Sequence, residues 1–159
     1  MAHSDLEVVT TLSVVLTGFS AFRLRGTRLL EIYTAHLAAR IGAKAFQSLR
    51  EAVHKLSEAS DDAEKDRILR HSILSDACLG PAARSLLKLW YVGVWHALPM
   101  AWHDRFGGAL DDTDCVPCPA SYTEGLLWPA IGTNPAGVKA QGYAMWARPP
   151  RIPNPSQEI

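Results

Sequence analysis

Apolar residues recur three and four positions apart along the first hundred residues of the chain, and glycine and proline are nearly absent from the interiors of these segments. This spacing gathers apolar side chains on one face of a helix, so it predicts a series of amphipathic helices. The first helix is expected at residues 6–19, with Thr17-Gly18 as its stop signal. A second helix follows Gly26, and its apolar face contains Leu29, Leu30, Ile32, Tyr33, His36, Leu37 and Ile41.

The next two helices are predicted from the residues that separate them. Gly42 is expected to divide the second helix from a third at residues 43–59, because glycine is unfavourable inside a helix. Asp61 and Glu64 have the spacing of a helix cap, which predicts a fourth helix that runs on through Leu74. The apolar face of the third helix contains Phe46, Leu49, Val53 and Leu56.

A fifth helix is predicted at residues 82–97. Gly80-Pro81 separates it from the fourth, since proline is well placed in a first helical turn. The segment is apolar almost all round, which is typical of a helix at the centre of a fold. Its large apolar residues are Leu86, Leu87, Leu89, Trp90, Tyr91, Val92, Val94 and Trp95.

The composition changes after Leu98, because all but one of the ten prolines lie beyond this residue. Proline lacks a backbone donor and interrupts helices, so residues 99–159 are expected to form a long irregular tail. The sequence therefore predicts a mainly α protein with one structural domain. Its helical body is a bundle of about five helices at residues 1–98, and its extended tail is rich in proline and aromatic residues.

The tail also contains aromatic side chains, which a solvated segment normally lacks. Such side chains need a surface to cover, so the favoured hypothesis is that the tail wraps both the body and a partner subunit. The alternative is that the tail only folds back onto its own helices. The aromatic residues of the tail are Trp102, Phe106, Tyr122, Trp128, Tyr143 and Trp146.

Length and charge narrow the class of protein. The 159 residues fall in the range of one domain, which is roughly 100–200 residues. Sixteen Lys and Arg balance sixteen Asp and Glu, so no overall field draws the chain to nucleic acid or to an anionic membrane. The most apolar stretch, residues 8–22, is interrupted by serine and threonine and is shorter than the ~20 apolar residues of a membrane span. A partner is therefore expected to be recognised by shape.

Cys115 and Cys118 are the one close pair among three cysteines. Their proline-containing loop lacks the strand and helix of a redox motif, and no second pair of metal ligands accompanies it. The preferred interpretation is a structural disulfide, within the chain or with another subunit. A small Cys/His metal-binding protein that uses both cysteines and His103 is an alternative. No HExxH pattern or G-x-S-x-G elbow is present, so no catalytic, cofactor-binding or metal site is predicted.

Several stretches of the chain together have the pattern of a known protein family. The run at residues 87–95 and the elements of the tail are the most specific parts of that pattern. The stretches are residues 12–19, residues 41–49, Leu87-Lys88-Leu89-Trp90-Tyr91-Val92-Gly93-Val94-Trp95, Tyr122-Thr123-Glu124-Gly125, Leu127-Trp128, Asn134-Pro135 and Tyr143-Ala144-Met145-Trp146. Over most of its length the chain thereby resembles the small (gamma) subunit of bacterial membrane-bound FAD-dependent sugar and polyol dehydrogenase complexes, of the fructose, sorbitol and glucose dehydrogenase type.

The resemblance implies a subunit that is not an enzyme by itself and holds no cofactor. Its partner would be a large flavoprotein of the glucose-methanol-choline (GMC) oxidoreductase type, which carries FAD and usually an iron–sulfur cluster. A multihaem cytochrome c subunit, with haem c, often completes such a complex. The small subunit supports folding, stability, maturation and export of the large one. The substrate sugar or alcohol would contact the large subunit.

The resemblance also implies a periplasmic location, at the cytoplasmic membrane through the complex. The chain shows no twin-arginine pair near its start, and Asp5 and Glu7 stand where a signal peptide would carry Lys or Arg, so a cytoplasmic location stays open. A helical protein that self-associates through its apolar fifth helix is an alternative function. The residues expected to be structural or to contact the large subunit are Trp90, Tyr91, Trp95, Trp102, Tyr122, Trp128, Tyr143 and Trp146.

Overall fold

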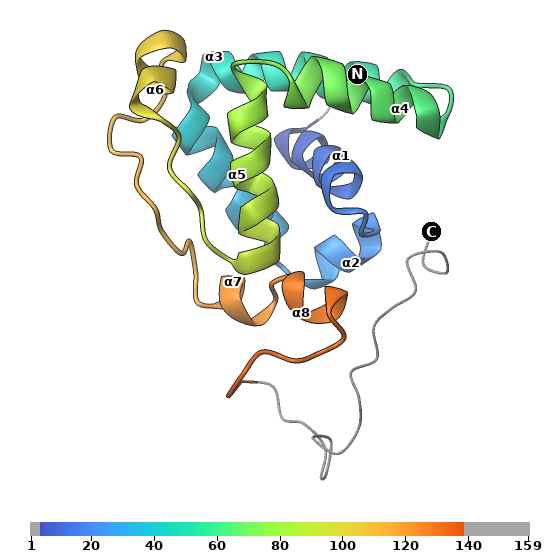
Figure 1. The fold of residues 1–159 in the computed structure, drawn as a ribbon, viewed down its shortest axis with the longest axis vertical. Coiled ribbons are helices and arrows are strands. Elements are labelled where there is room, and N and C mark those ends of the chain that lie inside the picture. The colour runs from blue at the N-terminus through green and yellow to red at the C-terminus, as the bar shows by residue number, and fades with distance from the viewer. Residues whose placement is uncertain (1–3, 139–159) are drawn as a thin grey trace.

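The protein is mainly α-helical, as the sequence predicts. The computed structural model describes residues 4–138, and within this range the only β-structure is one isolated bridge. The elements are, in chain order, α1 (Asp5–Thr17), α2 (Ala21–Gly26), α3 (Leu30–Glu58), α4 (Asp62–Ile68), the π-helix η1 (Leu69–Leu74), α5 (Leu79–Val92), α6 (Met100–Phe106), α7 (Ala120–Thr123) and α8 (Leu127–Ala130) (Figure 1).

Helices α1, α3 and α5 pack around the hydrophobic core (Figure 1). Each of them contributes a large side chain with no exposure to solvent: Leu12 from α1, Tyr33 from α3 and Trp90 from α5. The rings of Tyr33 and Trp90 meet edge to face, with 4.8 Å between their centroids, which is a favourable arrangement of two aromatic rings. The fifth predicted helix therefore lies at the centre of the fold, as expected, although its opposite face carries the exposed residues Arg84 and Lys88.

The first helix begins and ends close to the predicted residues. The Ser4 hydroxyl accepts a hydrogen bond from the Glu7 amide, and the Glu7 carboxylate accepts one from the Ser4 amide, which together form a capping box. Gly18 ends the helix with a φ of 74°. The sequence does not predict α2, whose N-cap is Ser20, because only six residues form this helix.

Gly42 divides the second and third predicted helices. Its φ of 76° and ψ of 167° are not helical, so the two segments of α3 meet there at a kink. The kink interrupts the helical hydrogen-bonding pattern, and the carbonyl of Arg40 accepts a hydrogen bond of 3.0 Å from the amide of Ala109 instead. The break in the helix thereby provides an attachment point for the tail.

The fourth predicted helix is present, but its winding changes along its length. The Asp61 carboxylate accepts a hydrogen bond of 2.7 Å from the Glu64 amide, which is the predicted cap. The segment is an α-helix up to Ile68 and a π-helix from there to Leu74. A π-turn changes the direction of the side chains that follow it, and Ile73 is fully buried against the core.

The fifth helix is shorter than predicted, since α5 ends at Val92 and not at Ala97. Gly93 takes a left-handed φ of 75°, and its amide bonds to the carbonyl of Leu89. The prediction that Trp95 lies in this helix is therefore wrong. Trp95 pairs instead with Cys115 in the isolated bridge, through two backbone hydrogen bonds of 2.8 and 3.1 Å. The apolar run continues past Gly93, which conceals the end of the helix.

The described part of the tail is irregular between three short helices that the sequence does not predict. Pro99 and Pro119 occupy the N-cap positions of α6 and α7, and Pro129 lies in the single turn of α8. Proline is tolerated at the start of a helix, because the first amides have no partner within the helix. Residues 99–138 pack on the body: for example, the Leu126 amide bonds to the Trp90 carbonyl. In this range the tail covers the body, which both interpretations expect, and the contact with a partner stays a prediction.

Asp112 ties the tail to the body. Its side chain is 1% exposed, and its carboxylate accepts hydrogen bonds from the Trp95 indole and the Leu98 amide, both at 2.8 Å. The His103 Nε2 lies 3.2 Å from it, and the Arg40 guanidinium lies 3.7 Å from it. A carboxylate is stable in the interior only when it is paired and hydrogen-bonded. Asp112 meets both conditions with partners from the body and from the tail.

Candidate partner-binding surface

Three of the predicted interface residues are core residues in this structure. Trp90 and Trp95 are completely buried, and Trp102 is 4% exposed. A buried indole needs an acceptor for its N–H group, and each of the three has one within the chain: the Ser13 hydroxyl, the Asp112 carboxylate and the Cys78 carbonyl. Of the two roles expected for these residues, structural or in contact with the large subunit, this structure gives them the structural one, because the chain itself covers their surfaces.

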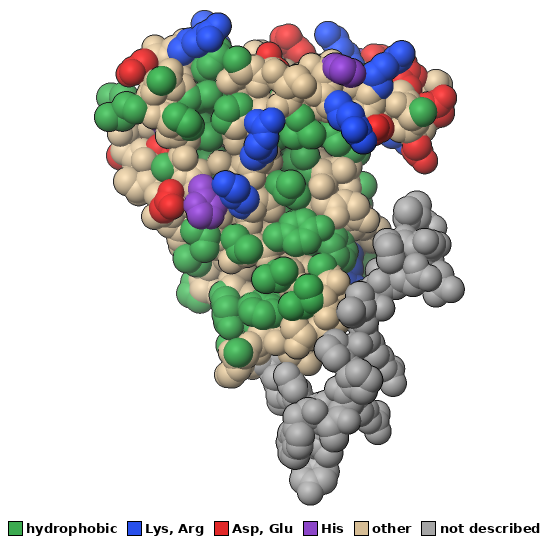
Figure 2. Space-filling view, viewed as in Figure 1, with side chains coloured by type: hydrophobic (Ala, Val, Ile, Leu, Met, Phe, Trp, Pro, Cys, Tyr) green, Lys and Arg blue, Asp and Glu red, His purple; other side chains and the backbone are tan. Residues whose placement is uncertain are grey.

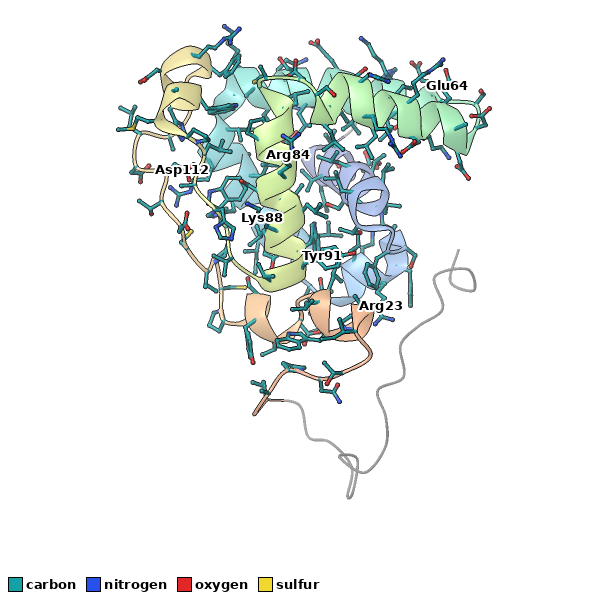
Figure 3. All side chains as sticks on the ribbon, viewed as in Figure 1. Arg23, Glu64, Arg84, Lys88, Tyr91 and Asp112 are labelled. Atoms are coloured by element: carbon teal, nitrogen blue, oxygen red, sulfur yellow. The ribbon has the colours of Figure 1, made fainter. Side chains whose placement is uncertain are left out.

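Tyr91 lies at the surface of the C-terminal end of α5 and is held in place by the loop after α1. Its hydroxyl donates a hydrogen bond of 3.0 Å to the Thr17 carbonyl, and its ring meets that of Phe19 edge to face at 6.3 Å. Partial burial raises the pKa of the Tyr91 hydroxyl. Figure 3 shows this side chain pointing from α5 toward α1 and α2. Tyr91 is therefore a fixed, half-exposed aromatic side chain.

Tyr122 and Trp128 form the second aromatic pair of this end of the molecule. Their rings meet edge to face with 5.3 Å between centroids. The Trp128 indole donates a hydrogen bond of 2.6 Å to the backbone carbonyl of Tyr122, so α8 holds its tryptophan against α7. Tyr122 is 40% exposed. The predicted interface residues Tyr143 and Trp146 lie outside the described residues.

These side chains belong to one continuous part of the surface. The backbone of the α7–α8 turn lies against the end of α5, so closely that a Cβ atom at Gly125 would come within 3.0 Å of the Tyr91 carbonyl. Figure 2 shows hydrophobic side chains gathered over the lower end of α5 and over α7 and α8. We call this region the aromatic end, and it consists of Tyr91, Val92, Tyr122 and Trp128. Val92, at 46% exposed, is apolar and without cover.

A cleft of about 410 Å³ adjoins the aromatic end, between α2 and the segment that follows α7. Arg23 and Thr27 line one side of it, and Trp128, Asn134 and Pro135 line the other. The Arg23 guanidinium lies 5.5 Å from the centroid of the Phe19 ring, in a cation–π contact that orients it. The cleft is mixed in polarity, so it forms a polar margin beside the apolar residues.

The predicted cysteine site is divided between two local environments. Cys115, Cys118 and Cys78 are free thiols in this structure. Cys115 Sγ lies 3.8 Å from His36 Nε2, and Cys118 Sγ lies 3.4 Å from Ser121 Oγ. A disulfide with another chain stays a prediction. His103 is bound to Asp112 and not to the cysteines, and no group of three metal-ligating side chains occurs among residues 4–138.

The sequence does not predict the buried positions of two residues, Asp112 and Ser121. Asp112 lies in an acidic loop that is typical of solvent-exposed turns, and only the folded chain buries it. Ser121 is fully buried beneath α5, although nothing in the sequence distinguishes it from other serines. Both depend on contacts between segments far apart in the chain, which local patterns do not encode.

Comparison of the chain with protein-family models, with curated proteins and with solved structures finds no match. The fold defines a mainly α protein. Because no relative was found, its function has to be argued from the residues of this chain. None of the described helices is both long and apolar enough to cross a membrane.

Proposed function

We propose that this chain is the non-catalytic small subunit of a FAD-dependent, GMC-type sugar or alcohol dehydrogenase complex, and that its aromatic end binds the large flavoprotein subunit. The cofactors would belong to the other subunits: FAD and an iron–sulfur cluster in the large one, and haem c in a cytochrome subunit. In this role the chain supports folding, stability, maturation and export of its partner, on the periplasmic side of the cytoplasmic membrane.

One observation carries the proposal: the most specific stretches of the resemblance converge on the aromatic end. The run at residues 87–95 includes the end of α5, and the stretches that begin at Tyr122 and Leu127 overlap α7 and α8. These stretches are separated in the chain by residues 96–121 but are adjacent in space, where the amide of Leu126 bonds to the carbonyl of Trp90.

The composition of the aromatic end also supports a protein partner. Aromatic residues are enriched at the centres of protein interfaces, where their large area is buried at a low entropy cost. Tyr91 and Trp128 are already fixed by hydrogen bonds to the backbone, so binding would immobilise few additional side chains. The arginine-lined cleft beside them would meet the polar rim of such an interface.

The first experiment is co-expression of the chain with the flavoprotein encoded beside it, followed by size-exclusion chromatography and a dye-linked sugar dehydrogenase assay. We expect the two proteins to elute together, and active yellow flavoprotein to require this chain. A flavoprotein that is equally soluble and active alone would refute the proposal. A chain that elutes alone at twice its monomer mass would instead favour self-association.

The second experiment tests the surface with a matched pair of variants. Val92→Lys introduces a charge into the aromatic end at a helix C-terminus, where a cation is tolerated by the helix dipole. We expect it to weaken the complex by about tenfold, which is the effect of losing roughly 1.4 kcal/mol at an interface. Leu110→Lys, at a residue 94% exposed and outside the aromatic end, is the control and is expected to leave the affinity unchanged. Equal affinity of the two variants would place the interface elsewhere.

A further inference from the structure

The loop that contains Cys115 and Cys118 lies beside α3, and the two thiols have different neighbours. Cys115 Sγ approaches His36 at 3.8 Å. Cys118 Sγ approaches the Ser121 hydroxyl at 3.4 Å, and both side chains lie near the Tyr33 hydroxyl. Tyr33 and His36 are three residues apart and therefore share one face of the helix, offset by about 4.5 Å along its axis.

Both members of the Cys115–His36 pair are held in position by the fold. The two backbone hydrogen bonds with Trp95 fix Cys115. The Trp95 ring also packs edge to face on the His36 imidazole, with 5.1 Å between centroids. Cys115 and His36 are both partly exposed, so a small reagent has access to the thiol. Because both residues are held by these contacts, the distance between the Cys115 sulfur and the His36 imidazole is set by the fold.

The surroundings of His36 keep its imidazole in the neutral form, which is the form that can accept a proton. Burial, followed by the Arg40 guanidinium one turn along α3, lowers the pKa of His36, while the Asp112 carboxylate opposes this effect. The imidazole is therefore neutral at neutral pH and has a nitrogen lone pair available.

We infer that Cys115 and Cys118 form a reversible dithiol–disulfide site in which His36 accepts the proton of the Cys115 thiol. The oxidant is a disulfide of low molecular mass or of another protein. The Cys115 thiolate attacks one sulfur of that disulfide, its S–S bond breaks, and the leaving thiolate takes up a proton. Cys118, after losing its own proton, attacks the Cys115 sulfur of the mixed disulfide and releases the second thiol. Two protein thiols are thereby oxidised and one disulfide is reduced to two thiols.

Cys78 provides an internal comparison within the same chain. Burial, followed by the carboxylate of Asp76, raises the pKa of the Cys78 thiol, so this residue has less thiolate at neutral pH. The two classes of cysteine can therefore be followed in one sample by mass spectrometry of peptides. The site is independent of the proposed complex, because all of its groups belong to this chain.

The test begins with the reduced wild-type chain at pH 7 and iodoacetamide below saturation. We expect Cys115 to be alkylated faster than Cys78, because burial raises the pKa of the Cys78 thiol, whereas the Cys115 thiol has the His36 imidazole beside it. With glutathione disulfide, the chain should lose the mass of two hydrogens and form a Cys115–Cys118 bond that dithiothreitol reverses. Equal alkylation rates of Cys115 and Cys78, or a chain that forms only glutathione adducts, would overturn the inference.

Variants then separate the roles of the three residues. Cys118→Ser should accumulate a glutathione mixed disulfide at Cys115, because the second step is removed. His36→Gln should slow alkylation of Cys115 about tenfold, whereas His71→Gln, at an exposed histidine of η1, should leave the rate unchanged. Circular dichroism verifies that each variant is folded. An unchanged Cys115 rate in folded His36→Gln would show that His36 is not the acceptor.

Discussion

The indole Nε1 of Trp90 donates a hydrogen bond of 2.9 Å to the hydroxyl of Ser13, and neither side chain is exposed to solvent. This contact joins α5 to α1 across 77 residues of sequence. Ser13→Ala removes the acceptor and leaves a buried N–H group without a partner, which costs about 1–3 kcal/mol. We expect a corresponding fall in the free energy of unfolding, measured by guanidinium titration with tryptophan fluorescence. Ser48→Ala, at an exposed serine of α3, is the control and should remain within 0.5 kcal/mol of wild type, a typical limit for surface changes.

Asp112→Asn tests the connection between the tail and the body. The variant keeps the size of the side chain but removes the charge that His103 and Arg40 face, and it presents an amide N–H₂ group to existing donors. Breaking a buried ion pair from one side costs about 3–5 kcal/mol. Hydrogen exchange of the Leu98 amide should accelerate together with the loss of stability. Asp111→Asn, whose side chain is 90% exposed, should show neither effect.

Gly93→Ala and Gly18→Ala separate two consequences of replacing a left-handed glycine. Both residues have φ values near 75°, but a Cβ atom at Gly18 meets nothing within 4 Å, whereas one at Gly93 would lie 2.7 Å from the carbonyl carbon of Ser121. Gly18→Ala should therefore cost only the backbone strain, roughly 1–2 kcal/mol. Gly93→Ala should cost more and should expose α7, which limited proteolysis would detect as cleavage near residue 121. Equal destabilisation by the two changes would mean that α7 does not pack on α5 as described.

The pKa of His36 predicts a dependence of stability on pH. Its folded-state pKa lies below the ordinary value of 6.5, chiefly because of burial, so the unfolded chain binds more protons than the folded chain just below pH 6.5. The free energy of unfolding should therefore fall as the pH falls below about 6.5, until the folded-state pKa is passed. Urea titrations of wild type and His36→Gln at pH 7, 6 and 5 measure the difference. A wild-type slope that His36→Gln does not reduce would contradict this assignment.

The helices with regular periodicity and clear end signals could be predicted from the sequence. Gly42 and the Asp61–Glu64 cap gave correct boundaries, because they act through local backbone geometry. The end of α5 was missed, since Val94 and Trp95 extend the apolar run beyond Gly93. The short helices of the tail were missed because of their prolines. Proline at an N-cap position is compatible with the start of a helix, but in a proline-rich segment it was interpreted as a residue that interrupts helices.

The candidate surface could be predicted only in part. Aromatic type alone did not distinguish Trp90, Trp95 and Trp102, which are covered by the chain, from Tyr91, Tyr122 and Trp128, which are at the surface. The difference arises from partners such as Ser13 and Asp112, and these become neighbours only in the folded chain. The proximity of His36 and Cys115 has the same origin, as they are 79 residues apart in sequence.

The hydrogen bond from the Leu126 amide to the Trp90 carbonyl also has a consequence for the chain as it is synthesised. At about 5–20 residues per second, a ribosome adds Leu126 roughly 2–7 s after it adds Val92. During that interval the segment that covers the C-terminal end of α5 is incomplete, and for the first part of it Asp112, the acceptor of the Trp95 indole, has not been added. The C-terminal end of α5 therefore acquires its cover far later than the time that a helix takes to form.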